Sequence, residues 1–188
     1  MAEELRALVD RCLDGDQAAM LMLVERFRGR VFGLCYRMLG NREDAEDAAQ
    51  ETFVRLLKNL GKWDSNRDFE PWLLAIAGNR CRTALASRKR RPPSYTIIDP
   101  IADDRPDLHA ANHLAEEVQL GLAQLRPDYR QAFILFHEHE LSYEQIAQTM
   151  SRPLGTIKTW IHRARSDLIR FLQQRNVIEE SSYAMRRV

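Results

Sequence analysis

The chain has 188 residues, of which 45% are hydrophobic and 29% are charged, and its formal net charge is +1. These proportions are typical of a folded chain and exclude global disorder. No run of about eighteen apolar residues is present, so we expect no membrane-spanning segment. The acidic start, Met1 to Glu4, is unlike a secretory signal, and three distant cysteines (Cys12, Cys35 and Cys81) favour neither a disulfide framework nor a zinc site. We therefore expect a cytoplasmic protein that holds no metal or cofactor.

The charge is distributed unevenly along the chain. Residues 1–91 hold 17 Lys and Arg against 14 Asp and Glu, residues 92–112 hold one against four, and residues 113–188 hold 10 against nine. Two stretches, 79–91 and 152–175, each contain six basic residues with at most one acid. Such stripes indicate nucleic-acid binding, because phosphate contacts supply most of its affinity, although either stripe could be a solvated helix face.

The first part of the chain has the periodicity of helices. Apolar residues recur at steps of three and four from Met20 to Met38, which predicts a helix that ends at Gly40. Asn41 is expected to cap a second helix, and Asp44 three residues further on resembles a capping box in outline, with Asp in place of Glu or Gln. A third helix is expected to start near Pro71, because proline suits the first turn of a helix.

A stretch rich in proline and aspartate then interrupts this pattern and predicts a linker. After it, the apolar spacing predicts one helix from Leu114 to Leu125 and another from Tyr129 to Phe136. Strand-like alternation is absent, so the fold class is all-α. We expect two helical lobes, divided as follows: first domain 1–91, linker 92–112, second domain 113–175, and a tail of unknown role 176–188.

Residues 142–172 give the strongest local signal. Ser142 and Gln145 predict a capping box that opens a short helix, and Pro153 then suits the start of a longer, basic helix. The small side chain of Ala147 would let the two helices approach closely. The pattern is typical of a helix-turn-helix, whose second helix enters the major groove of DNA. The alternative is a plain helical hairpin whose basic side is solvated.

Three stretches of the sequence appear in the order typical of one family: Asp44–Phe53; Trp72–Arg80; and Leu141–Ala147 with Gly155–Lys158 and His162–Arg165. Together they resemble the extracytoplasmic-function (ECF) sigma factors of bacterial RNA polymerase, over about residues 8 to 172. The resemblance implies a protein without catalysis of its own, which binds core RNA polymerase, directs it to promoter DNA and helps to open the duplex. It also implies an anti-sigma factor as the usual inhibitory partner.

The resemblance implies that the acidic helix binds the clamp helices of the largest polymerase subunit, through Asp44, Asp47, Gln50 and Glu51. On a helical wheel, the three acids fall within about 60° of each other, opposite the apolar side of the helix. The alternative is that acids near a helix start complement its dipole, which would suit Asp44 and Asp47 better than Glu51.

By the same resemblance, the helix from Trp72 to Arg91 and the loop before it read the melted minus-ten element. Such reading needs polar groups for flipped bases and cations for the DNA backbone. The candidate base readers are Asn66, Arg67, Asn79 and Arg80. The candidate backbone contacts are Arg88, Arg90 and Arg91. Trp63 could stack on a base or pack in the core, whereas the register of Trp72 with Leu73 and Ile76 favours the core.

The second lobe resembles the reader of the minus-thirty-five element, with these candidates on its basic helix: Lys158, Thr159, His162, Arg163 and Arg165. His162 and Arg163 lie about 130° from the apolar stripe, whereas Arg165 and Trp160 lie about 70° from it on opposite sides. We therefore expect Arg165 to contact a phosphate at most and Trp160 to cover the core edge. Many relatives have Arg where this chain has Phe136 and Trp160, so its promoter sequence cannot be taken from a relative.

Three alternatives remain open on the sequence alone. A dimeric helix-turn-helix repressor would need a dimerisation helix and would not need the acidic helix. A metal-dependent enzyme would use the four histidines of the second half, but no general base lies at motif spacing from them (His109, His113, His137 and His139). A purely structural helical scaffold would leave the segregated charge unexplained.

Overall fold

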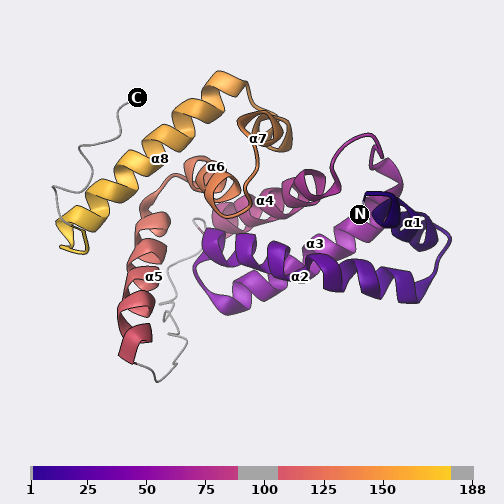
Figure 1. The fold of residues 1–188 in the computed structure, drawn as a ribbon, viewed down its shortest axis with the longest axis horizontal. Helices are drawn as coiled ribbons and strands as arrows, with labels where there is room; N and C mark the ends of the chain where they lie inside the picture. The colour runs from indigo at the N-terminus through magenta and orange to yellow at the C-terminus, as the bar shows by residue number, and fades with distance from the viewer. Residues whose placement is uncertain (1, 89–105, 179–188) are drawn as a thin grey trace.

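The computed structural model describes residues 2–88, called here the first lobe, and residues 106–178, called the second lobe. All regular secondary structure within these ranges is helical, as the sequence predicts (Figure 1). The two lobes lie side by side, with α4 of the first against α6 and α7 of the second. Arg90 and Arg91, two candidate backbone contacts, lie outside the described residues.

The first lobe consists of four α-helices and a short 3-10 helix: α1 (Ala2–Leu13), α2 (Gln17–Leu39), α3 (Arg42–Asn59), η1 (Leu60–Lys62) and α4 (Phe69–Arg88). As predicted, α2 ends at Gly40, whose φ of 78° is a left-handed conformation that glycine adopts without steric cost. Asn41 begins α3, and its Oδ1 accepts a hydrogen bond from the backbone N–H of Asp44 at 2.7 Å. The turn between α2 and α3 is therefore set by adjacent residues.

The second lobe consists of α5 (Pro106–Gln124), α6 (Pro127–His137), α7 (Tyr143–Met150) and α8 (Leu154–Gln174). α5 begins at Pro106, within the stretch of 92–112 that the sequence predicts as a linker. Proline lacks the N–H that a first helical residue leaves unpaired, so Pro106 can start a helix that it could not continue. The rest of that linker lies outside the described residues.

The helix-turn-helix forms as the sequence predicts. Ser142 Oγ accepts from the backbone N–H of Gln145 at 3.1 Å, while the Ser142 N–H donates to Gln145 Oε1 at 2.9 Å, which completes the capping box. Ser151 then reverses the chain with a φ of 52°. The second helix starts at Leu154, one residue later than expected, with Pro153 in the capping position.

The buried side chains form two clusters. The smaller one lies between α5, α6 and α8 and includes Leu122 and Leu168. The larger one joins α1 to α4 with residues of the second lobe, among them Leu135, Ile146 and Ile157. The lobes therefore share one continuous apolar core, an arrangement that the sequence did not predict.

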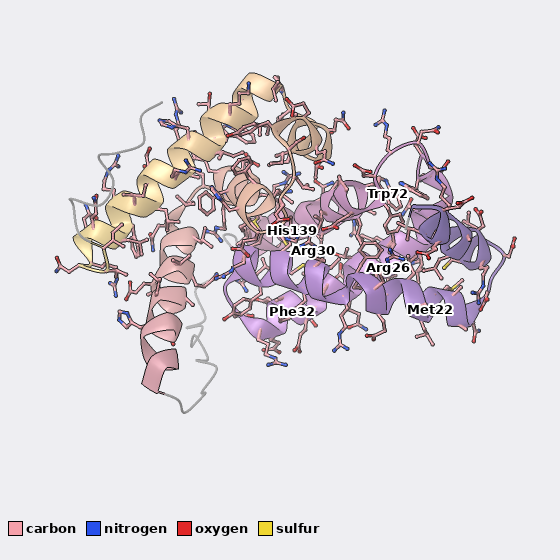
Figure 2. The ribbon with its side chains drawn as sticks, in the orientation of Figure 1. Met22, Arg26, Arg30, Phe32, Trp72 and His139 are labelled. Carbon is pink, nitrogen blue, oxygen red and sulfur yellow. The ribbon has the colours of Figure 1, made fainter. Side chains whose placement is uncertain are left out.

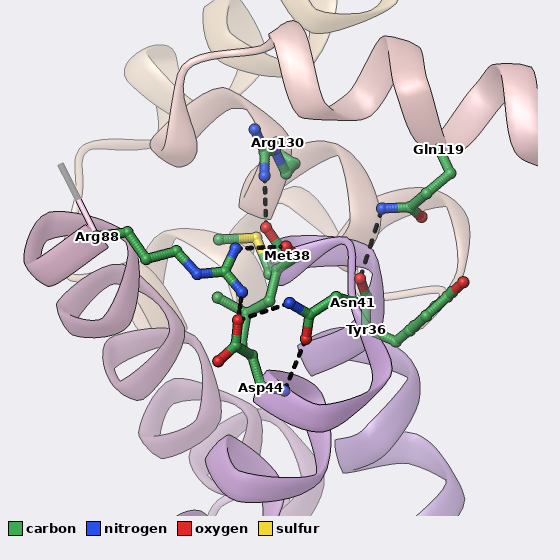
Figure 3. Close-up of polar contacts among 8 residues, drawn as sticks. Tyr36, Met38, Asn41, Asp44, Arg88, Gln119 and Arg130 are labelled. Atoms are coloured by element: carbon green, nitrogen blue, oxygen red, sulfur yellow. Dashed lines mark hydrogen bonds and ion pairs between the residues drawn. The ribbon is translucent and has the colours of Figure 1, made fainter. Parts of the chain in front are cut away.

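The C-terminal end of α2 is held largely by the second lobe (Figure 3). Arg130 of α6 donates to the backbone carbonyl oxygen of Met38, and Gln119 of α5 donates to that of Arg37 at 3.3 Å. The last carbonyls of a helix have no partner within it, so these contacts satisfy groups that would otherwise be buried unpaired. Burial lowers the pKa of Arg130 to about 10, because desolvation disfavours the charged form.

Candidate functional site

The outer face of α3 presents three of the four candidate polymerase contacts. Asp47, Gln50 and Glu51 are exposed, whereas the opposite side of the helix is buried in the core. Gln50 and Glu51 also line a shallow groove with Arg55, Lys58 and Val54, an apolar side chain that is 48% exposed. Sequence reasoning missed Val54, although it is a valine outside the apolar stripe of its helix. This face therefore combines two acids with an apolar centre, and two cations lie toward its C-terminal end.

Asp44, the fourth candidate, has a different environment. It lies half-buried at the start of α3, where its carboxylate accepts from Asn41 Nδ2 at 2.8 Å and forms an ion pair with Arg88 (Figure 3). Arg88 also donates to the backbone carbonyl oxygen of Leu39 at 2.9 Å, and burial lowers the pKa of its guanidinium. Asp44 and Arg88, predicted for two different surfaces, thus join the start of α3 to the end of α4.

A second pair of candidates from different predicted surfaces also meets. Arg80 of α4 donates from Nη2 to Glu51 Oε1 of α3 at 2.7 Å. Asn79, the neighbouring residue, is exposed, and its Oδ1 accepts from Arg82 Nη2. The predicted polymerase and minus-ten surfaces are therefore adjacent and share an edge along α3 and α4.

The loop before α4 exposes both of its candidates. The backbone N–H of Asn66 donates to Asp64 Oδ1 at 3.0 Å, and Arg67 Nε lies 3.4 Å from the Asp64 carboxylate. Asp68, at the end of the loop, accepts from Gln145 Nε2 of α7 at 2.9 Å. Asp64 thus orders the loop locally, and the second lobe contacts its far end.

Both tryptophans of this region pack against the core. The Trp72 ring lies 5.6 Å from that of Phe69, which agrees with the predicted core position (Figure 2). Trp63 is half-buried and meets the same Phe69 ring edge-on at 5.1 Å. Of the two readings of Trp63, core packing is the one observed in this conformation.

All candidate minus-thirty-five contacts are exposed on α8: Lys158, Thr159, His162, Arg163 and Arg165. Arg163 donates from Nη1 to the Tyr129 hydroxyl at 3.1 Å, and Arg165 Nη2 lies 3.3 Å from His137 Nε2. Trp160 is half-buried, contacts both apolar clusters and lies 5.9 Å from the Tyr129 ring. The helical wheel therefore placed Trp160 at the core edge correctly.

Phe136 also packs rather than projecting to solvent. Its ring stacks on that of Tyr143 with 4.8 Å between centroids, and it contacts the larger core. It therefore joins α6 to α7 behind the helix-turn-helix.

The described residues contain no group of three or more His, Cys, Asp and Glu side chains arranged to hold a metal ion. His139 is buried and lies 3.7 Å from Glu70, whereas His137 contacts Phe133 and Phe136. Over the same described residues, no helix has the length and apolar character needed to cross a bilayer. The metal-enzyme alternative thus gains no support from this part of the chain.

Comparison with known proteins identifies the family. The family models for Sigma-70 region 2 and Sigma-70 region 4 match residues 23–91 and 115–168. The ECF RNA polymerase sigma factor SigW of Bacillus subtilis is 36% identical over 168 residues, which cover 82% of this chain and 89% of that protein. The RNA polymerase sigma-H factor of Pseudomonas aeruginosa is 32% identical over 183 residues, covering 91% and 95%.

Two solved structures share the fold. The sigma factor RpoE of Bartonella quintana, in complex with the anti-sigma factor NepR, matches with a TM-score of 0.67 and 22% identity over 81% of this chain and 95% of that one. CnrH, in complex with the cytosolic domain of CnrY, matches with a TM-score of 0.66 and 23% identity over 90% and 97%. The helical lobes, the two matched regions and the curated relatives agree: the chain belongs to the ECF sigma factors of RNA polymerase.

Proposed function

We propose that this sigma factor divides its work among three surfaces, one for core polymerase and two for promoter DNA. Membership of the family means that the chain directs RNA polymerase to promoters in transcription initiation, and a dimeric repressor is not favoured. We further propose that it works in the cytoplasm and has no catalytic activity of its own. For the domain division we propose a first domain of 1–91, a linker of 92–112, a second domain of 113–175 and a tail of unknown role of 176–188.

The polymerase surface is the outer face of α3. Asp47 and Glu51 carry the negative charge, Gln50 adds a neutral polar side chain, and the exposed Val54 supplies apolar area beside them. A partner of opposite charge would be attracted at a distance and would then desolvate Val54 on contact. Asp44 belongs at the edge of this surface, because Arg88 already neutralises much of its charge.

The minus-ten surface consists of the loop before α4 and the exposed side of α4. Asn66, Arg67, Asn79 and Arg80 offer donors and acceptors to bases that have left the stack. Arg88, Arg90 and Arg91 follow in sequence as backbone cations. Their close spacing supports a path for one DNA strand along α4.

The minus-thirty-five surface is the exposed side of α8, and one observation carries the proposal. The first half of α8 exposes four polar side chains: Lys158, Thr159, His162 and Arg163. The apolar stripe that begins at Ile157 packs the other side of the helix against the rest of the lobe. In a helix-turn-helix, these first turns meet the base edges in the major groove. Arg165 lies further along and suits a phosphate.

Run-off transcription with core polymerase on a genomic promoter pool tests the function. Sequencing the transcript starts should return one recurrent pair of upstream elements with this chain, and none with core polymerase alone. A chain with Asp47→Lys and Glu51→Lys is the matched negative control. Absence of specific starts would refute the proposal, and a stable dimer in gel filtration that represses instead would favour the repressor.

An anti-sigma factor is the partner that we propose for regulation. RpoE of Bartonella quintana was solved with the anti-sigma factor NepR, and CnrH with the cytosolic domain of CnrY. Affinity capture with the tagged chain, followed by inhibition of run-off transcription by the captured protein, tests this proposal.

A further inference from the structure

Arg82 of α4 links the proposed minus-ten surface to the second lobe. Its Nη1 donates to Gln131 Oε1 at 3.0 Å and lies 3.6 Å from the Asp128 carboxylate, both on α6. Its Nη2 donates to Oδ1 of Asn79, a candidate base reader. Arg82 therefore contacts a candidate base reader through Nη2 and the second lobe through Nη1.

Gly78, four residues before Arg82, allows this close approach. Gln131 is completely buried, and a Cβ placed on Gly78 would lie 2.0 Å from its Nε2 and 2.6 Å from its Cδ. Any side chain at this position would displace Gln131. The α4–α6 contact is thus closely fitted and contains a polar centre.

The same contact continues toward the start of α4. Gln145 of α7 donates to Asp68 at 2.9 Å, and Thr149 Oγ1 donates to the backbone carbonyl oxygen of Pro71 at 3.4 Å. The second lobe therefore follows α4 from the end of its preceding loop to Arg82. This is the region that the proposed function assigns to the melted strand.

Promoter geometry requires the two lobes to separate. The minus-ten and minus-thirty-five elements lie about 25 base pairs apart, or roughly 85 Å along B-DNA at about 3.4 Å per base pair. With α4 packed directly against α6 and α7, α8 cannot reach the second element while α4 holds the first (Figure 1). The observed arrangement is therefore a closed form, and promoter binding needs an open one.

We propose that the guanidinium of Arg82 binds Asp128 and Gln131 in the closed form and the DNA backbone in the open form. The second lobe and the minus-ten strand would then compete for one surface of α4. The inference rests on the proposed minus-ten function. An arginine fork binds the oxygens of phosphate as it binds those of carboxylate, and Asp128 supplies such oxygens in the closed form. Arg82, which sequence reasoning did not select, is then a DNA contact.

The test measures fluorescence anisotropy of a labelled single-stranded oligonucleotide, the non-template minus-ten strand recovered from run-off start sites. Asp128→Ala with Gln131→Ala should bind it at least about 5-fold more tightly than the unchanged chain, because the competitor is weakened. Arg82→Ala should bind more weakly than the unchanged chain, although it breaks the same contacts with α6. Far-UV circular dichroism checks that each variant is folded.

Asp167→Ala is the matched control, because it removes an acid of the second lobe that pairs with Arg170 on its own helix. The affinity of this variant for the oligonucleotide should equal that of the unchanged chain. An unchanged affinity for the Asp128 and Gln131 variant would overturn the competition. A gain in affinity for Arg82→Ala would overturn its role as a DNA contact. Failure of the unchanged chain and all variants to bind would instead remove the proposed minus-ten surface, and the inference with it.

Discussion

Replacing Gly78 by alanine should open the closed form. The added Cβ would lie 2.0 Å from Gln131 Nε2, well inside contact distance, and Gln131 has no exposed surface into which it can retreat. Overpacking of this kind costs about 1–3 kcal/mol. Because the clash exists only when α4 meets α6, the whole cost shifts the equilibrium toward the open form, by about 5- to 150-fold.

Helix propensity does not obscure this result. Alanine is more favourable than glycine in a helix by about 1 kcal/mol, but the gain applies equally to the open and closed forms and cancels between them. Gly29→Ala in α2 is the matched control, since nothing lies within 4 Å of the added Cβ. It should raise the melting temperature and leave the lobes closed.

Energy transfer between dyes on the two lobes measures the opening. Ser65→Cys and Gln148→Cys provide exposed attachment sites, whereas the native cysteines are buried. Gly78→Ala should lower the transfer efficiency. In a chain that already carries Gln131→Ala, adding Gly78→Ala should lower the efficiency less, because the shorter side chain leaves room for the Cβ. If Gly78→Ala stays as closed as the unchanged chain, or if Gln131→Ala does not reduce its effect, the packing argument is wrong.

Four further predictions concern the other surfaces and the stability of the fold. Asp47→Lys with Glu51→Lys should weaken pull-down of core polymerase without unfolding the chain; Arg80→Ala, which breaks the ion pair of Glu51 from the other side, should retain binding. Arg163→Ala should change which minus-thirty-five sequences a promoter library returns, because it removes about 1–3 kcal/mol of discrimination between bases. Arg165→Ala should weaken binding to all promoters alike. Trp160→Ala should instead lower the melting temperature, and its loss of unfolding free energy should be smaller than the roughly 3–5 kcal/mol of a fully buried tryptophan. A shift in sequence preference without destabilisation would contradict its core position. His139, whose Nδ1 lies 3.7 Å from the Glu70 carboxylate, and Arg30, whose Nε donates to it at 2.6 Å, hold the pKa of Glu70 below its ordinary value. The resulting stability is present above the unfolded pKa of about 4.3 and is lost as the pH falls through the lower folded value. The melting-temperature difference between the chain and Glu70→Gln should therefore shrink as the pH falls below about 4.3, and a difference that does not shrink would refute this role of Glu70.

The sequence by itself determined the local features of this fold. Gly40 and Asn41 place the turn between α2 and α3, because a left-handed backbone and a capping side chain depend on residues a few positions apart. Ser142 and Gln145 fix the start of α7 in the same way. The helical period sufficed to place Trp160 at the core edge, and the order of the motifs identified the family.

Only the tertiary structure decided which surfaces meet. Arg88 with Asp44, Arg80 with Glu51 and Arg82 with Gln131 pair side chains 29 to 49 residues apart, and Arg130 binds the carbonyl of Met38 across 92 residues. No periodicity predicts such pairs, because they depend on how whole helices cross and not on neighbours along the chain. The shared core of the two lobes arises in the same way: each apolar stripe marks a face to be buried, and the folded chain determines the helix that buries it.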